Sequence, residues 1–281
     1  MKYFRSKNII SILLFFLGLS ILFYPLISDK WNTYRDQTLL AAYDKEIKHS
    51  SKKDVDKIWE AAKKYNKALG IQKVPDAFSV REDIKDRKYE SSLNIGNNQV
   101  MGYIDIPSIK VNIPIYHYTT DSSLSKGAGH LFGSALPVGG EGTHTVISAH
   151  RGLPSAKLFT DLPLVKKGDY FYFHILNHSI AYKVDKIIVV KPYQVETLAG
   201  ARGKDYATLI TCTPYGVNTK RLLVRGHRVP YNKDKHNRES NKNSKVDTKR
   251  LIIQCIAGIS GIILALAIFN TYKFISKNKN S

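Results

Sequence analysis

The stretch Thr208–Gly226, TLITCTPYGVNTKRLLVRG, contains two apolar runs joined by a connection rich in turn-forming residues. The first run ends at Cys212 and the second begins at Arg221, with eight residues between them. Pro, Gly and Asn in that connection favour an antiparallel hairpin. The end of one strand and the start of its antiparallel neighbour lie at the same edge of a sheet. Cys212 and Arg221 are therefore predicted to be neighbours in space.

The same kind of short β-branched or aromatic run extends back to Val100. Gly, Pro, Asn and Asp separate the runs, and no regular helices are indicated between them. Seven or eight strands over about 130 residues predict a closed or sandwich-like β architecture. The runs are MGYIDIP, KVNIPIYHY, THTVISAH, DYFYFHIL, IAYKVDKIIVV, YATLITC and RLLVRGHRV.

The residues before the strands divide into two parts. Val55, Ile58 and Trp59 belong to an apolar set at helical spacing, so residues 29–70 are predicted to form helices that pack on the domain. Residues 71–98 are polar, carry mixed charge and lack periodicity, which predicts a long surface loop.

Two uncharged stretches flank the whole region, Asn8–Ser28 and Leu251–Tyr272. Each is long enough to cross a hydrocarbon core of about 30 Å, so two flanking transmembrane helices are predicted. The alternatives are a cleaved signal peptide for the first, against which the bulky residues after it argue, and a buried soluble helix for the second. Basic residues at both outer ends predict cytoplasmic termini and an external segment between the spans.

These patterns predict a chain of seven segments. In order they are a cytoplasmic start and N-terminal span (1–28), N-terminal helices (29–70), a loop (71–98), the β domain (99–230), a basic tether (231–250), a C-terminal span (251–272) and a cytoplasmic tail (273–281).

The chain contains only two cysteines, and Cys255 falls in the second expected span. Cys212 is then the only external cysteine, which excludes a disulfide within the domain. His150 ends another apolar run, and a thiol, an imidazole and the Arg221 guanidinium together suit acyl transfer. From the residues alone the alternatives stay open, since a strand-end cysteine is often a small buried apolar residue and Arg225 could replace Arg221.

Composition and motifs exclude several other classes of function. The net charge of +20 fits a basic surface that faces an anionic membrane and cell wall, and no groove-reading motif predicts nucleic-acid binding. GGEG at Gly139–Gly142 precedes a strand and opens no helix, so it does not predict a phosphate loop. No cysteine, histidine or acidic pair has the spacing of a structural zinc site.

Three stretches resemble the class C, pilin-polymerising branch of the sortase family: TLITCTPYGVNTKRLLVRG, GHLFGSALPVGGEGTHTVISAHRGLP and GYIDIPSIKVNIPIYH. The resemblance implies a mainly β fold, an eight-stranded closed barrel, with Cys212, His150 and Arg221 at the catalytic positions. It also implies a lid loop over the thiol. In that loop PDAF places Asp76 against Arg221 and Phe78 over Cys212, with Ala77 where the family usually has proline.

The implied activity is that of a cysteine transpeptidase. It would cleave an LPxTG-like sorting signal between Thr and Gly and join the acyl group to a lysine of another pilin subunit, without a cofactor or metal. The resemblance places a monomeric enzyme at the cell membrane, with its catalytic domain on the cell-wall side. Two alternatives are a housekeeping sortase that attaches surface proteins to cell-wall precursor and a non-enzymatic tethered adhesin.

Overall fold

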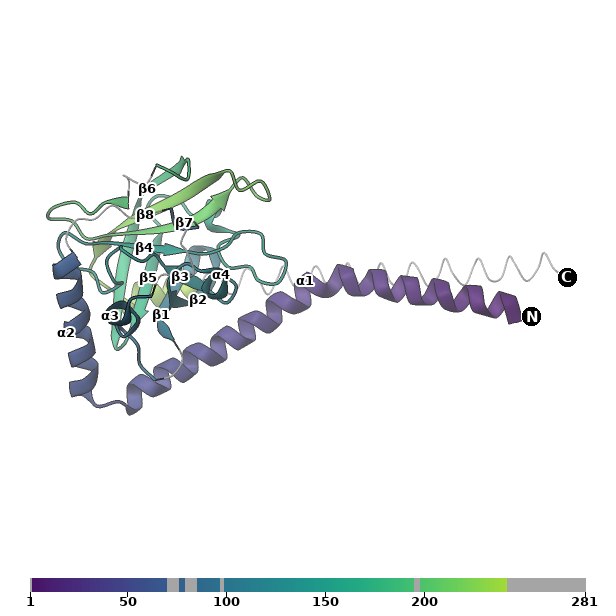
Figure 1. Cartoon of the computed structure of the whole chain (residues 1–281), viewed down its shortest axis with the longest axis horizontal. Coiled ribbons are helices and arrows are strands. Elements are labelled where there is room, and N and C mark those ends of the chain that lie inside the picture. Colours follow the sequence, from purple (N-terminus) through teal and green to yellow (C-terminus); the bar gives the residue numbers. More distant parts are fainter. Residues whose placement is uncertain (1, 70–75, 79–84, 97–98, 195–197, 242–281) are drawn as a thin grey trace. The chain divides into compact units, whose positions relative to one another are not determined.

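The computed structural model describes residues 2–69, 76–78, 85–96, 99–194 and 198–241 (Figure 1). The chain divides into two compact units, Met1–Asn232 and Lys233–Ser281. Within the second unit, residues 233–241 are helical. The elements that position the site all lie in the first unit.

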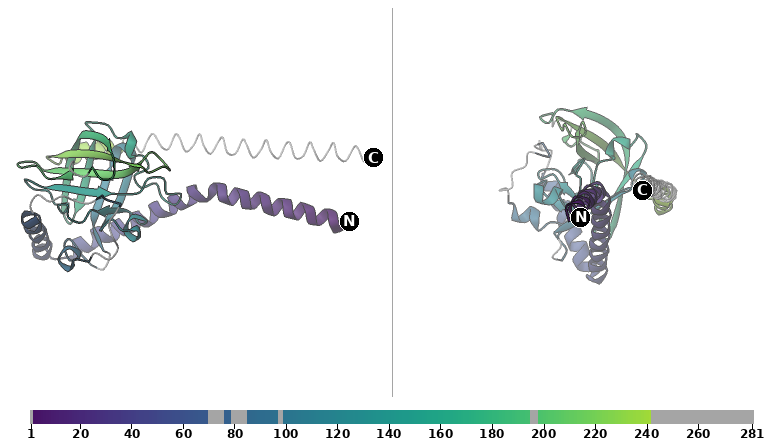
Figure 2. Two further views of the ribbon diagram at one scale, coloured as in Figure 1. Left: turned by 45° about the horizontal axis from the view of Figure 1, so that its top comes forward. Right: turned by 90° about the vertical axis from the view of Figure 1, so that its right-hand side faces the viewer.

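An eight-stranded closed barrel forms the body of the first unit (Figures 1 and 2). The strand order is β1-β2-β3-β4-β7-β8-β6-β5, and β5 pairs with β1 to close the barrel. Neighbouring strands are antiparallel except for the parallel pairs β2–β3 and β4–β7. The predicted closed β-barrel is therefore confirmed. Its strands are β1 (Val100–Ile106), β2 (Val111–His117), β3 (Ala128–His130), β4 (His144–Ser148), β5 (Tyr170–Ile175), β6 (His178–Val190), β7 (Tyr206–Thr213) and β8 (Lys220–Val229).

Helices precede the barrel and interrupt its connections. Tyr43 fastens the first helix to the barrel, because its buried hydroxyl donates to the Met101 carbonyl at 3.1 Å and accepts from the Leu176 backbone N–H at 2.8 Å. The helices are α1 (Lys2–His49), α2 (Lys52–Leu69), α3 (Arg87–Glu90) and α4 (Asp121–Leu124), with short 3-10 turns at η1 (Pro107–Ile109) and η2 (Leu162–Leu164).

The prediction of transmembrane helices is wrong for the part of the chain that the structure describes. No helix there is both long enough and apolar enough to cross a bilayer. The second expected span, 251–272, lies outside the described residues.

Strands β4 and β7 bury apolar residues on both of their faces. Ile147 and Leu209 belong to the main core inside the barrel, whereas Val146 and Ile210 belong to a second apolar cluster. Leu223 of β8 joins that second cluster. Because successive side chains of a strand point to opposite faces, the second cluster lies on the outer surface of these three strands. We call it the outer cluster.

Two anchors hold the chain on either side of residues 76–78. At the end of α2, the buried Asn66 donates from Nδ2 to the Leu136 carbonyl at 3.0 Å and accepts from the Leu136 N–H at 2.7 Å. In α3, the fully buried Tyr89 has its hydroxyl 2.7 Å from Nδ1 of His130. The loop that was predicted over 71–98 thus contains a short helix whose buried tyrosine is fixed to the barrel.

The buried His130 predicts a loss of stability in acid. Its Nε2 lies 2.8 Å from the Ala135 carbonyl, so Nε2 carries the proton and Nδ1 accepts from Tyr89. Burial lowers the pKa of His130 to about 4. The folded protein therefore keeps this ring neutral at pH values where the unfolded chain, with a pKa of about 6.5, is protonated. The stabilisation is present above the unfolded pKa and is lost as the pH falls from about 6.5 to about 4.

We expect the free energy of unfolding to fall by about 2 kcal/mol more between pH 6.5 and pH 4.5 in the wild type than in His130→Gln. Urea unfolding curves at both pH values measure this difference. His49→Gln, at the exposed end of α1, is the matched control for the exchange of a histidine for glutamine. An identical pH dependence in wild type and His130→Gln would contradict the prediction.

Candidate active site

Cys212 lies near the end of β7 and Arg221 near the start of β8, directly opposite each other in the antiparallel register. Nη1 of Arg221 lies 3.6 Å from Sγ of Cys212. The same Nη1 donates to the Asn218 carbonyl at 3.0 Å, which ties the guanidinium to the turn. The hairpin geometry that the sequence predicts therefore brings the thiol and the guanidinium together.

Asp76 forms a two-pronged ion pair with Arg221. Nε of Arg221 donates to Oδ1 of Asp76 at 3.0 Å, and Nη2 donates to Oδ2 at 2.9 Å. Both side chains are nearly buried, with 12% of Arg221 and 13% of Asp76 exposed. A paired, bidentate geometry of this kind fixes the plane of the guanidinium as well as its position. The structure therefore places Asp76 against Arg221, the pairing that the family resemblance implies, and the role of these residues as a lid stays a prediction.

Phe78 lies between the arginine and the histidine. Its ring centroid is 4.9 Å from Cζ of Arg221 and 5.8 Å from the centroid of the His150 ring. The first distance is that of a cation–π contact. His150 follows the end of β4 and approaches the site from the other strand of the β4–β7 pair. One aromatic side chain thus contacts both the guanidinium and the imidazole.

The surroundings of Ala77 were not predicted from the sequence. The sequence shows only that alanine stands where the family usually has proline, which puts the rigidity of the lid in doubt. In the structure Ala77 is fully buried and packs in the outer cluster with Leu131, Leu198 and Ile210. The segment 76–78 is therefore held at three points: by an ion pair, by a buried methyl group and by an aromatic ring.

The surroundings of the site disfavour the charged forms of both reactive groups. Burial raises the pKa of the Cys212 thiol, and the nearby Asp76 carboxylate adds to the rise while Arg221 opposes it. Burial lowers the pKa of His150, against an opposing effect of Asp121 in α4. With Asp76 and Phe78 in place, the site therefore favours a neutral thiol beside a neutral imidazole.

Arg151 is a residue near the site that the sequence reasoning missed. Its Nη1 donates to Oγ1 of Thr213 at 3.1 Å, and its guanidinium lies 5.7 Å from the centroid of the Tyr215 ring. Gly152 has a φ of +83°, and a Cβ there would lie 2.8 Å from the Tyr215 ring. Arg151 thus joins the loop that carries His150 to the loop after Cys212. Its position beside His150 was the only signal in the sequence.

The sortase family matches this chain directly. The family model described as Sortase domain matches residues 104–229, which include Cys212, His150 and Arg221. A curated relative, sortase A of Bacillus anthracis, is 31% identical over 147 residues, which cover 52% of this chain and 68% of the relative.

Solved structures of sortase C proteins are similar over most of their length. Sortase C of Streptococcus pneumoniae is 43% identical with a TM-score of 0.64, over 69% of this chain and 97% of that one. Sortase C1 of Streptococcus agalactiae is 40% identical with a TM-score of 0.65, over 70% of this chain and 97% of that one. With its closed barrel and its thiol–guanidinium pair, the chain therefore belongs to the sortase family of cysteine transpeptidases, and within it to the class C branch.

Proposed function

We propose that this sortase cleaves an LPxTG-like sorting signal between Thr and Gly and transfers the acyl group to a lysine of another pilin subunit. In this proposal Cys212 is the nucleophile, His150 the general acid and base, and Arg221 the oxyanion-stabilising group. One observation carries it. The Cys212 thiol lies against the Arg221 guanidinium, and a single ring, Phe78, contacts both that guanidinium and the His150 imidazole.

The first half of the reaction forms a thioester. The Cys212 thiol gives its proton to His150, and the thiolate that results attacks the threonine carbonyl carbon. Arg221, which stays charged throughout, stabilises the oxyanion that develops. Protonated His150 gives its proton to the departing glycine amine as the C–N bond breaks.

The second half resolves the thioester. A lysine ε-amine attacks the thioester carbonyl and loses a proton to His150, which forms an isopeptide bond and releases the Cys212 thiolate. Over the whole reaction a lysine amine replaces a glycine amine on the same threonine carbonyl, so no redox partner is needed.

Residues Asp76 and Phe78 act as a lid in this proposal. They occupy the guanidinium and the space beside the imidazole, so a substrate carbonyl reaches the thiol only after they leave. Their departure also removes the Asp76 charge and much of the burial that raise the pKa of Cys212. Opening of the lid and activation of the thiol are therefore one event.

Pilin as the substrate is supported by the solved relatives. The Streptococcus pneumoniae sortase C structure is described in connection with pilin substrate specificity. We place the reaction at the surface of a Gram-positive cell, where sortases act. A housekeeping role, with a cell-wall precursor amine as acceptor, is the second candidate, and it has sortase A relatives in its favour. Membership of an enzyme family argues against the adhesin alternative.

Incubation of the purified protein with two pilin subunits tests the proposal. One subunit carries the sorting signal and the other carries an acceptor lysine. We expect a ladder of covalent products in denaturing gels, with a Lys–Thr isopeptide found by mass spectrometry of the excised bands. Transfer to a cell-wall precursor amine without any ladder would favour the housekeeping role instead.

Arg151 gives a further prediction about the chemical step. Arg151→Ala removes one charge-assisted hydrogen bond between the loop that carries His150 and the end of β7, next to Cys212. We expect kcat for sorting-signal cleavage to fall about tenfold, with KM little changed, because the bond positions catalytic groups and touches no substrate. Arg151→Lys, which keeps one cationic donor to Thr213, should recover part of the loss.

Peptide cleavage followed by liquid chromatography measures both constants. Arg202→Ala, in an exposed loop, is the matched control and should leave kcat unchanged. A rise in KM alone for Arg151→Ala would mean that Arg151 binds substrate and does not position the imidazole.

A further inference from the structure

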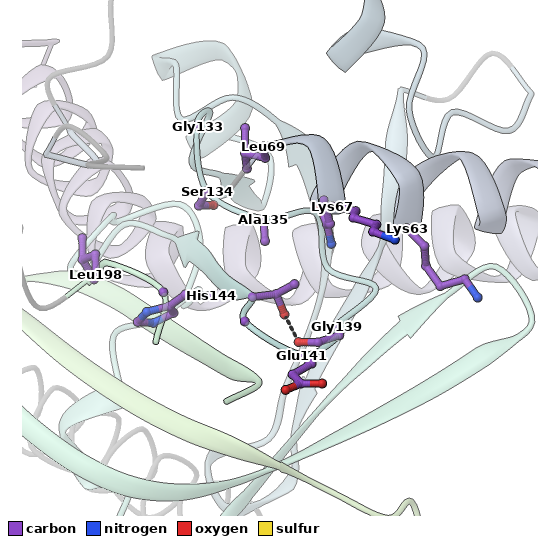
Figure 3. Close-up of a pocket in the computed structure, with 15 residues that line it drawn as sticks. Lys63, Lys67, Leu69, Gly133, Ser134, Ala135, Gly139, Glu141, His144 and Leu198 are labelled. Carbon is purple, nitrogen blue, oxygen red and sulfur yellow. Dashed lines mark hydrogen bonds between the residues drawn. The ribbon is translucent and has the colours of Figure 1, made fainter. Parts of the chain in front are cut away.

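A cavity of about 400 Å³ lies next to the start of β4, the strand whose other end leads to His150 (Figure 3). Lys63 and Lys67 of α2 line it together with Glu141 of the glycine-rich loop, and Leu69 and Leu198 supply apolar surface. None of these residues belongs to the catalytic proposal. Cys212 does not line the cavity, but strands β4 and β7 extend from the cavity toward the thiol.

One face of the β4–β7 pair runs from this cavity to the thiol. His144 lines the cavity, and its Nε2 lies 2.7 Å from Oγ1 of Thr208 on β7. Val146 and Ile210 follow two residues further along their strands, on the same face, in the outer cluster. Cys212 comes two residues after Ile210. Ala77, Leu131 and Leu198 cover this face, so a peptide that connects the cavity with the nucleophile along it has to displace Ala77.

The distance along β7 fixes which peptide residues reach the cavity. Thr208 and Cys212 are four residues apart, or about 13 Å at about 3.3 Å per residue. An extended peptide has the same rise. With the carbonyl of the first residue before the cut at Cys212, the fifth residue before the cut therefore lies level with Thr208. The fifth to seventh residues before the cut lie at the cavity.

The order of Leu69 and Asp76 along the chain indicates the N-to-C direction in which such a peptide lies. Leu69 lines the cavity, and seven residues later Asp76 pairs with Arg221 beside the thiol. Leu69 at the cavity therefore precedes Asp76 at the thiol in the N-to-C order of the chain, and Ala77 already occupies the outer cluster. A substrate that replaces the lid in the same sense places residues N-terminal to the scissile bond in the cavity.

The charge of the lining favours acidic residues there. Lys63 and Lys67 present two ammonium groups against the single carboxylate of Glu141. The Nζ of Lys63 lies 2.7 Å from Glu60, but both side chains are largely exposed, and such surface pairs are weak enough to exchange partners. The protein as a whole carries a net charge of +20, which attracts an acidic segment to this surface.

We propose that this cavity is a remote subsite for an acidic segment of the substrate protein, five to seven residues before the scissile bond. The proposal rests on the proposed function, because it requires a sorting-signal peptide to lie along β4 and β7. It adds a specificity determinant outside the sorting signal itself, in which Lys63 and Lys67 bind the acidic residues of the substrate.

Three peptides with the same sorting signal test the subsite. One has three acidic residues at the fifth to seventh positions before the cut, one has neutral residues there, and one has the acidic residues after the cut. We expect the first to show kcat/KM about tenfold above the second, through KM, in low-salt buffer. The third should behave like the neutral peptide.

Charge reversal at the cavity identifies the residues responsible. In Lys63→Glu/Lys67→Glu the preference should invert, so that the acidic peptide becomes the poorer substrate. Lys64→Glu, an exposed residue of α2 that does not line the cavity, is the matched control and should keep the wild-type preference.

The outcomes separate this inference from the function on which it rests. Turnover of all three peptides at equal kcat/KM, or a preference for acidic residues after the cut, overturns the subsite and leaves the proposed function standing. Absence of turnover for every peptide overturns both. If the double charge reversal leaves the preference for the acidic peptide unchanged, that preference arises from another surface. This result also overturns the subsite.

Discussion

Replacement of Cys212 by alanine is expected to lower kcat/KM for a sorting-signal peptide by about 10⁴-fold or more. The thiol is the nucleophile that the enzyme supplies in the proposed mechanism, and no other cysteine lies in the β domain. Arg221 and His150 remain in Cys212→Ala, but without the sulfur they have no thioester to form or resolve. Liquid chromatography of the cleaved peptide measures the loss.

The structure gives reasons to expect that this variant folds. Cys212 is a small residue at the end of β7, and its backbone pairing with Arg221 does not depend on the side chain. Thermal unfolding and circular dichroism of Cys212→Ala should therefore match the wild type closely. Normal peptide turnover by a folded Cys212→Ala would show that the nucleophile is wrong.

Removal of the lid contacts is expected to make the Cys212 thiol react much faster with an alkylating reagent. In Asp76→Ala/Phe78→Ala the bidentate ion pair with Arg221 and the cation–π contact are both lost. A lid held less tightly by about 2 kcal/mol opens about 30 times more often. We expect alkylation of Cys212 by iodoacetamide to be faster by about that factor at pH 7.

The pH dependence of alkylation gives a second readout with a definite sign. Burial and the Asp76 carboxylate both raise the pKa of the Cys212 thiol, and the double variant removes the carboxylate and reduces the burial. The midpoint of the rate–pH curve should therefore move to lower pH, because the thiolate is the reacting form. Asp185→Ala, which breaks a comparable bidentate pair with Arg225 away from the thiol, should change neither rate nor midpoint. Unchanged alkylation in the double variant would mean that residues 76–78 do not cover the site.

Most of the barrel was predictable because seven of its eight strands carry their own local signal, whereas the three-residue β3 was not among the predicted runs. Alternating or continuous apolar runs and the turn residues between them are short-range features, and the hairpin between β7 and β8 follows from one eight-residue connection. The closeness of Cys212 and Arg221 follows from that hairpin. The place of His150 at the end of an apolar run made it a candidate, but the choice of His150 among nine histidines depended on the family resemblance.

The packing of the lid was not predictable in the same way. Ala77 is buried against Leu131, Leu198 and Ile210, which are separated from it by at least 54 residues of sequence, and a polar, aperiodic loop gives no signal for such contacts. The bond from Arg151 to Thr213 spans 62 residues and was missed for the same reason. The transmembrane prediction failed for a different reason. It rested on a count of uncharged residues alone, and no helix in the described part of the chain is both long enough and apolar enough to cross a bilayer.

Intact-protein mass spectrometry of the enzyme mixed with a sorting-signal peptide tests the central claim most directly. The account predicts a covalent species whose added mass equals the peptide fragment ending at threonine, less one water, and fragment mapping should place it on Cys212. The adduct should disappear when a lysine-bearing acceptor is added. Cleavage of the peptide with no adduct at Cys212, or with an adduct at another residue, would contradict the account.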